Sequence, residues 1–230
     1  MTVDPNLGQL ELAATHLGSL MDELVLVGGC VTGLLITDAG AAPIRATVDV
    51  DLVLEAVTYP EYAAFERRLR AHGFAQRGDP DDPICRWHHG ALIVDVIPVG
   101  GFLGFTNEWY SSAVETKVSA TLPSGRSIHH VDAPHFLGTK LAAFKSRGAD
   151  DAVMSHDAED VVLVVDGRPQ ILAEVAAAPV ALRTHIADGI SMLLDDRLFM
   201  DGFEGYFDRT IAAERAKLIT GRLSTLANRS

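Results

Sequence analysis

Hydrophobic residues change their spacing at several points along the chain, and each change predicts an element. Leucines recur at broadly helical spacing over residues 7–22, which favours an amphipathic helix. Residues 23–30 form a short apolar segment that ends in paired glycines, which is typical of a strand followed by a turn. Residues 46–56 alternate apolar and polar side chains with a period of two, which predicts a second strand.

The remaining patterns divide the chain into a mixed part and a helical part. Helices are predicted at 31–40 and 59–74, a hairpin of two strands joined at Gly90 at 84–89 and 91–99, and two weaker strands within 113–131. Beyond residue 132 only helices are expected, at 133–148, 155–167, 169–199 and 208–227. We therefore predict an α+β protein in which a mixed β-sheet flanked by helices (residues 1–132) is followed by a helical C-terminal domain (133–230) packed against it.

Composition narrows the class of protein. A hydrophobic fraction of 48% and a charged fraction of 22% are typical of a globular protein, and no apolar run approaches the roughly 18–20 residues of a membrane span. No signal peptide is readable, and two cysteines are too few for a disulfide framework, so we expect a cytoplasmic protein with no membrane partner. The net charge of −12 argues against broad electrostatic binding of nucleic acid.

Carboxylates interrupt two of the predicted strands. Asp49 and Asp51 are two residues apart, so on a strand they project from one face about 7 Å apart. Asp95 interrupts the apolar segment 91–99 in the same way. If these strands are neighbours, three carboxylates share one patch and would bind Mg²⁺ or Mn²⁺. The alternative is a set of solvent-facing acids on the sheet surface.

Gly28 and Gly29 follow the first predicted strand directly. Glycines at a strand-to-helix turn let backbone N–H groups approach phosphates. Many such turns, however, use glycine only for its backbone freedom. Arg86 and Trp87 precede the strand with Asp95 and could stack on a nucleobase, although a packed aromatic is favoured.

Taken in order, these segments resemble a known family. The motifs are VLVGG, RATVDVDLVLE, ALIVDVIP, APHFLGTKLAAFKSRG and SHDAEDVVLVVDGR, spread over residues 20–170. Together they look like the nucleotidyltransferases of the AbiEii/AbiGii toxin type, a branch of the DNA polymerase β-like superfamily. The last 60 residues match only as a generic helical domain.

The resemblance implies roles for individual residues. Metal ions, Mg²⁺ or Mn²⁺, would be held by the acids of the D-x-D motif and the neighbouring strand, which are Asp49, Asp51 and Asp95, the catalytic residues. The nucleoside triphosphate would be bound by the glycine turn, the basic residue before the D-x-D motif, and the lysine and acidic motifs: Gly28, Gly29, Arg45, Lys140, Lys145, Arg147, Asp157 and Asp160.

Simpler interpretations exist for the last two motifs. The lysine segment 133–148 also fits a solvated amphipathic helix. Asp157 and Asp160 also fit the first turn of a helix, where negative charge is favoured, with Ser155 as its N-cap.

The activity implied by the resemblance is transfer of a nucleoside monophosphate from a triphosphate to an acceptor hydroxyl on RNA, protein or a small molecule. A tRNA acceptor is not favoured by the charge. Some such enzymes act as toxins in toxin–antitoxin pairs, so an antitoxin is an expected partner. The alternative is a catalytically inactive protein that keeps the fold and binds a nucleotide or a partner.

Overall fold

The computed structural model describes residues 4–147, 152, 154–207 and 212–228. These residues form two compact units. Unit 1 contains Asp4, residues 32–44 and the described residues from 133 onward, and unit 2 contains residues 5–31 and 45–132. The division is discontinuous in sequence, because the chain leaves unit 2 after Val31 and returns to it at Arg45.

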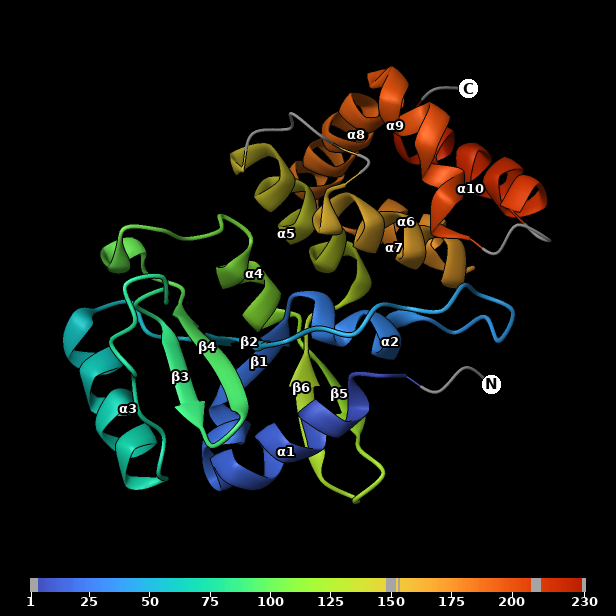
Figure 1. Ribbon diagram of the computed structural model, residues 1–230. Helices are drawn as coiled ribbons and strands as arrows, with labels where there is room; N and C mark the ends of the chain where they lie inside the picture. Colours follow the sequence, from blue (N-terminus) through green and yellow to red (C-terminus); the bar gives the residue numbers. More distant parts are fainter. Residues whose placement is uncertain (1–3, 148–151, 153, 208–211, 229–230) are drawn as a thin grey trace. The chain divides into compact units, whose positions relative to one another are not determined.

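Unit 2 is built on a mixed six-stranded sheet, so the protein belongs to the α+β class, as predicted. The strand order is β3-β4-β2-β1-β6-β5, which can be followed across Figure 1. β1 and β2 are antiparallel, β2 and β4 are parallel, and β1 and β6 are parallel. Two antiparallel hairpins, β3–β4 and β5–β6, form the ends of the sheet. The strands are β1 Leu24–Val27, β2 Val50–Leu54, β3 Arg86–His89, β4 Leu92–Pro98, β5 Val118–Thr121 and β6 Ser127–His130.

The helices of unit 2 bury apolar side chains beside this sheet. They are α1 Leu7–Leu17, α3 Tyr59–Ala71 and α4 Tyr110–Glu115. α3 begins with a capping box, in which the carboxylate of Glu61 accepts hydrogen bonds from the backbone N–H groups of Val57 and Thr58 at 2.9 and 3.0 Å. These bonds lower the pKa of Glu61. Tyr62, buried on α3, donates a 2.9 Å hydrogen bond to the carbonyl of Val96 and so ties the helix to β4.

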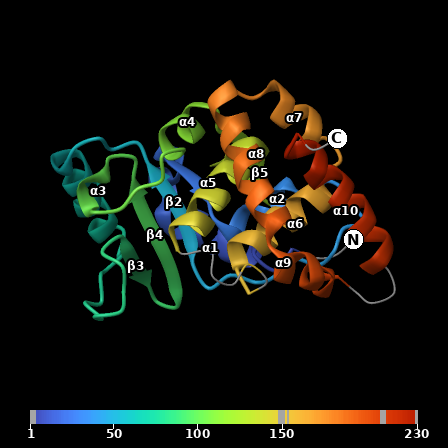
Figure 2. The ribbon, with the colours of Figure 1, turned by 90° about the horizontal axis from the view of Figure 1, so that it is seen from above.

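Unit 1 is helical, and Figure 2 shows its long helices α5, α8 and α10. α6 lies at its centre: residues 161–165 on this helix are all at most 1% exposed. Segment 32–44 packs against the end of α6, where the backbone N–H groups of Thr37 and Asp38 both donate to the carbonyl of Gly167 at 2.9 Å. The helices are α2 Thr32–Leu35, α5 Ala133–Ser146, α6 His156–Gly167, α7 Ile171–Ala177, α8 Val180–Asp195, α9 Arg197–Gly202 and α10 Ala212–Leu226.

Several elements differ from the sequence-based expectation. The helix expected at 31–40 is a 3₁₀ turn, Gly29–Val31, followed by the single-turn helix α2, after which the chain is irregular. α4 was not expected at all. The predicted hairpin at Gly90 is confirmed, with Gly90 at φ +60°. Among the described residues, no helix is long and apolar enough to cross a membrane.

Candidate functional site

Asp51 and Asp95 are direct neighbours in the sheet. β2 and β4 are parallel, and their register pairs Val50 with Val94 and Asp51 with Asp95. Paired residues of adjacent strands project from the same face, so the two aspartates lie side by side. The pair Val50 and Val94 points to the opposite face, where both side chains are fully buried. This alternation places Asp51 and Asp95 on the face opposite that pair.

Asp49 lies outside the strand that was predicted to carry it. It occupies a bend immediately before β2, and its carbonyl accepts a 3.2 Å hydrogen bond from the hydroxyl of Thr47. The structure nevertheless brings Asp49 to Asp95, because both carboxylates contact the same side chain, Arg86. We call Asp49, Asp51, Asp95 and Arg86 the carboxylate cluster.

Arg86 links two of the acids. Its Nε and Nη2 donate to the two oxygens of Asp95 at 2.9 and 2.8 Å, and Nη2 also donates to Oδ2 of Asp49 at 2.6 Å. The sheet places it there, since Arg86 on β3 is the antiparallel register partner of Asp95 on β4. The hydrogen bond to Asp95, followed by the charges of Asp95, Asp49 and Asp82, raises the pKa of Arg86, which stays protonated.

The cluster offers oxygen ligands of the kind that magnesium prefers. Oδ2 of Asp49 and Oδ2 of Asp95 contact one nitrogen atom of Arg86, so they are close enough to share a cation. Within the described ranges, no three potential ligand side chains already converge around one point. Mg²⁺ commonly binds through only one or two carboxylates, with substrate phosphates and water completing its shell. The carboxylate oxygens are therefore chemically compatible with a magnesium ion whose remaining ligands come from outside the protein.

Gly28 borders the cluster, and its conformation requires glycine. It follows Val27, the register partner of Asp51, and has φ +69°. A Cβ at this position would lie 2.7 Å from Cγ of Asp51 and would overlap the carboxylate. The absence of a Cβ at Gly28 therefore leaves the space that the Asp51 carboxylate occupies. Gly29 is buried in the 3₁₀ turn that follows.

Arg45 is partly exposed, and its backbone carbonyl accepts a 3.2 Å hydrogen bond from the side-chain amide of Asn6.

The lysine and acidic motifs meet in unit 1. Nζ of Lys140 lies 3.1 Å from Oδ1 of Asp157 and 2.7 Å from Oδ2 of Asp160, and Arg147 donates to Oδ2 of Asp157 at 2.6 Å. The side chains of Lys140, Asp157 and Asp160 are 9, 5 and 1% exposed, whereas that of Arg147 is 73% exposed. We call these four residues the Lys140 cluster. Two positive and two negative charges balance within it.

Lys145 does not take part in these ion pairs. It is exposed and has no ion pair among the described residues. Helical geometry explains the difference, because position 147 is two turns from 140 and lies on the same face, whereas position 145 is rotated away. A role for Lys145 in nucleotide binding remains a prediction.

The expected N-cap of α6 is confirmed. The hydroxyl of Ser155 accepts a hydrogen bond from the backbone N–H of Ala158 at 3.4 Å. Asp157 therefore lies in the first turn of α6, where the helix dipole favours its charge. The helix-start interpretation is therefore confirmed for Asp157, which also forms an ion pair with Lys140. A role for Asp157 in nucleotide binding stays a prediction.

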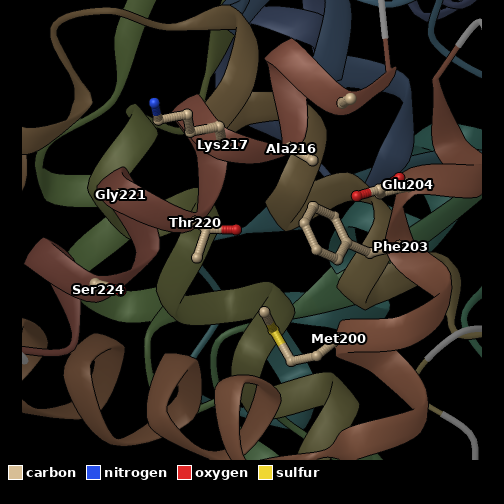
Figure 3. A pocket seen from close by; sticks show the side chains of 9 residues that line it. Met200, Phe203, Glu204, Ala216, Lys217, Thr220, Gly221 and Ser224 are labelled. Carbon is tan, nitrogen blue, oxygen red and sulfur yellow. The ribbon is translucent and has the colours of Figure 1, made fainter.

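A separate cavity of about 420 Å³ lies within unit 1 (Figure 3). Met200 and Phe203 line one side of it, and Ala216 and Thr220 of α10 line the other. None of the residues predicted for the site lines this cavity.

Sequence reasoning missed Arg86, although a signal for it existed. A hairpin with a two-residue turn at Gly90 pairs His89 with Leu92, and the same register continued along the strands pairs Arg86 with Asp95. The sequence alone suggests for Arg86 only stacking on a base. Its neighbour Trp87 is fully buried, in agreement with the packing role that was favoured.

Comparison of the sequence with models of protein families gave no match, and comparison with curated proteins gave none.

Proposed function

We propose that this protein is a metal-dependent nucleotidyltransferase. It would move a nucleoside monophosphate from a nucleoside triphosphate to an acceptor hydroxyl. The observation that carries the proposal is the convergence of Asp49 and Asp95 on one cationic nitrogen, beside Asp51 in the same row of the sheet. The ordered resemblance to AbiEii/AbiGii-type nucleotidyltransferases, and with it their fold, supports the same conclusion.

Asp49, Asp51 and Asp95 would hold Mg²⁺ or Mn²⁺. When bound, the ion supplies positive charge that stabilises the triphosphate as negative charge develops on the leaving group. Gly28 and Gly29 border this row of acids at the end of β1, so their turn is the proposed binding site for the triphosphate, with Arg45 as a further cation.

The reaction is an in-line substitution at phosphorus. The oxygen of the acceptor hydroxyl forms a bond to the α-phosphorus, the bond from the α-phosphorus to the bridging oxygen breaks, and pyrophosphate leaves. Asp95 would take the proton of the hydroxyl. Its carboxylate is 9% exposed and is positioned by Arg86 through one hydrogen bond to each oxygen, so the proton would be taken on a lone pair that Arg86 leaves unused.

The Lys140 cluster would contribute separately to nucleotide binding. Lys140 is committed to two buried aspartates, so we assign it to holding Asp157 and Asp160 in place. Arg147 is bound to Asp157 on one side and is largely exposed on the other, so it is the member that would receive an anion.

The test is a transfer assay. The protein is incubated with labelled nucleoside triphosphates, Mg²⁺ and three acceptor classes, namely tRNA, protein and small molecules. We expect transfer that requires Mg²⁺ and is abolished by Asp49→Asn combined with Asp51→Asn. The matched control is Asp22→Asn combined with Asp81→Asn, which makes the same chemical change at two exposed acids of unit 2. Transfer that survives the first double variant would overturn the proposal.

A role as the toxin of a toxin–antitoxin pair is a further part of the proposal. Its test is expression in a bacterial host. We expect growth arrest that Asp49→Ala relieves, and an antitoxin protein as the neutralising partner. Growth that is arrested equally by the Asp49→Ala variant would exclude nucleotidyl transfer as the cause.

A second candidate function is nucleotide or partner binding without turnover. The observation that favours it is that Arg86 forms ion pairs with both Asp49 and Asp95 and so occupies part of their ligand oxygens. Calorimetric titration with a nucleoside triphosphate discriminates between the two functions. Binding that is the same with and without Mg²⁺, with no product formed, would favour the binding protein.

A further inference from the structure

Arg86 is surrounded by more negative charge than one guanidinium neutralises. Besides Asp95 and Asp49, Asp82 lies 3.7 Å from Nη1. The Arg86 side chain is only 21% exposed, so these interactions are screened less than at an open surface. His88 also contacts Asp82, at 2.9 Å. Arg86 is thus the cation that these three acids share.

The two main contacts of Arg86 are unequal. Asp95 is bound through both of its oxygens and is 9% exposed, whereas Asp49 is bound through one oxygen and is 32% exposed. A bidentate bond between a guanidinium and a buried carboxylate is the stronger of the two types. The bond to Asp49 is therefore the one that yields when another cation competes for this acid.

We propose that Arg86 is a built-in counter-ion that competes with the divalent cation for Asp49 and thereby sets the metal affinity of the carboxylate cluster. Without metal, Arg86 offsets the repulsion between the acids. With metal, Nη2 is released from Asp49 while Nε remains on Asp95. The released N–H group would then be available to an anion, and a triphosphate is the anion that the proposed function supplies. This inference rests on the proposed function for the identity of the competing cation.

The experiment measures Mn²⁺ binding without nucleotide, by calorimetry and by electron paramagnetic resonance of free Mn²⁺. Arg86→Gln removes the competing cation, so we expect Mn²⁺ to bind on the order of tenfold more tightly than to the wild-type protein. Arg86→Lys keeps the positive charge but cannot form the bidentate hydrogen bonds to Asp95, so we expect an affinity for Mn²⁺ between those of the wild-type protein and Arg86→Gln. The matched control is Arg67→Gln, which removes an equal charge from the exposed face of α3 and should leave the affinity unchanged.

Thermal unfolding gives a second readout that does not depend on activity. Metal-free Arg86→Gln leaves Asp49 and Asp95 without their cation, so we expect a lower Tm than in the wild-type protein. Saturating Mn²⁺ should raise the Tm of Arg86→Gln by more than that of the wild-type protein, because it replaces the lost charge.

The outcomes separate this inference from the proposed function. If the wild-type protein binds Mn²⁺ through Asp49 and Asp51, but Arg86→Gln and Arg86→Lys bind it equally or more weakly, the competition is refuted and the metal site stands. If neither the wild-type protein nor the variants bind Mn²⁺ at millimolar concentration, this inference falls, whereas the proposed function is decided by the transfer assay with nucleoside triphosphate.

Discussion

Replacing Lys140 with methionine removes the central cation of the Lys140 cluster while keeping most of the unbranched side chain. In the wild-type protein, Nζ of Lys140 contacts Asp160 at 2.7 Å and Asp157 at 3.1 Å. After the change, Asp157 keeps Arg147 at 2.6 Å, but Asp160 is 1% exposed and loses this cation. Removing one partner of a buried ion pair costs about 3–5 kcal/mol, because the remaining charge is poorly solvated.

That loss is a large part of the total, since a protein of this kind has about 5–15 kcal/mol of stability. The assay is urea unfolding monitored by far-ultraviolet circular dichroism. This signal reports the loss of helix, and unit 1 is helical. At about 1–3 kcal/mol per molar urea, we expect the midpoint to fall by roughly 1–2 M or more.

Lys145→Met is the control, because it makes the same change at an exposed position of the same helix. Its free energy of unfolding should stay within about 0.5 kcal/mol of that of the wild-type protein. A double variant, Lys140→Met with Asp160→Asn, should recover part of the loss, since it also removes the buried charge that Lys140 offsets. Equal midpoints for Lys140→Met and Lys145→Met would refute the reasoning.

Three further predictions concern other positions. Gly28→Ala should lose several-fold or more in Mn²⁺ affinity and destabilise the protein by more than about 1 kcal/mol, because its Cβ overlaps Asp51 and φ is positive; calorimetry and urea unfolding test both. Tyr62→Phe should cost about 1 kcal/mol through the lost bond to Val96, measured by urea unfolding. Burial raises the pKa of Asp166, so the folded protein holds this proton more tightly than the unfolded chain and stability falls as pH rises above about 4; Asp166→Asn should flatten that fall in unfolding measured against pH.

Local patterns in the sequence determined the type of most elements. The period of two at residues 46–56 predicts a strand with one polar face, whereas the short, continuous apolar segments before Gly28 and around Asp95 predict strands that are buried on both faces. The N-cap residues of α3 and α6, Thr58 and Ser155, bond to backbone groups only a few positions away. Their positions in the sequence therefore indicate where these helices begin.

Tertiary structure decided which of these residues meet. The adjacency of Asp51 and Asp95 depends on the parallel pairing of β2 and β4, whose strands are far apart in sequence, so no local pattern specifies their register. Arg86 reaches Asp49 because both lie beside β4. β3, which carries Arg86, pairs with β4 on one side, and β2, which follows the bend at Asp49, pairs with it on the other.

Contacts between segments far apart in the sequence also decide the composition of unit 1. The sequence assigned segment 32–44 to the first domain because it lies between two strands, but its backbone is held by the end of α6, and this long-range contact has no local signature. The sequence thus determined the acids and their elements, whereas the three-dimensional pairing of those elements supplied the cation that binds the acids together.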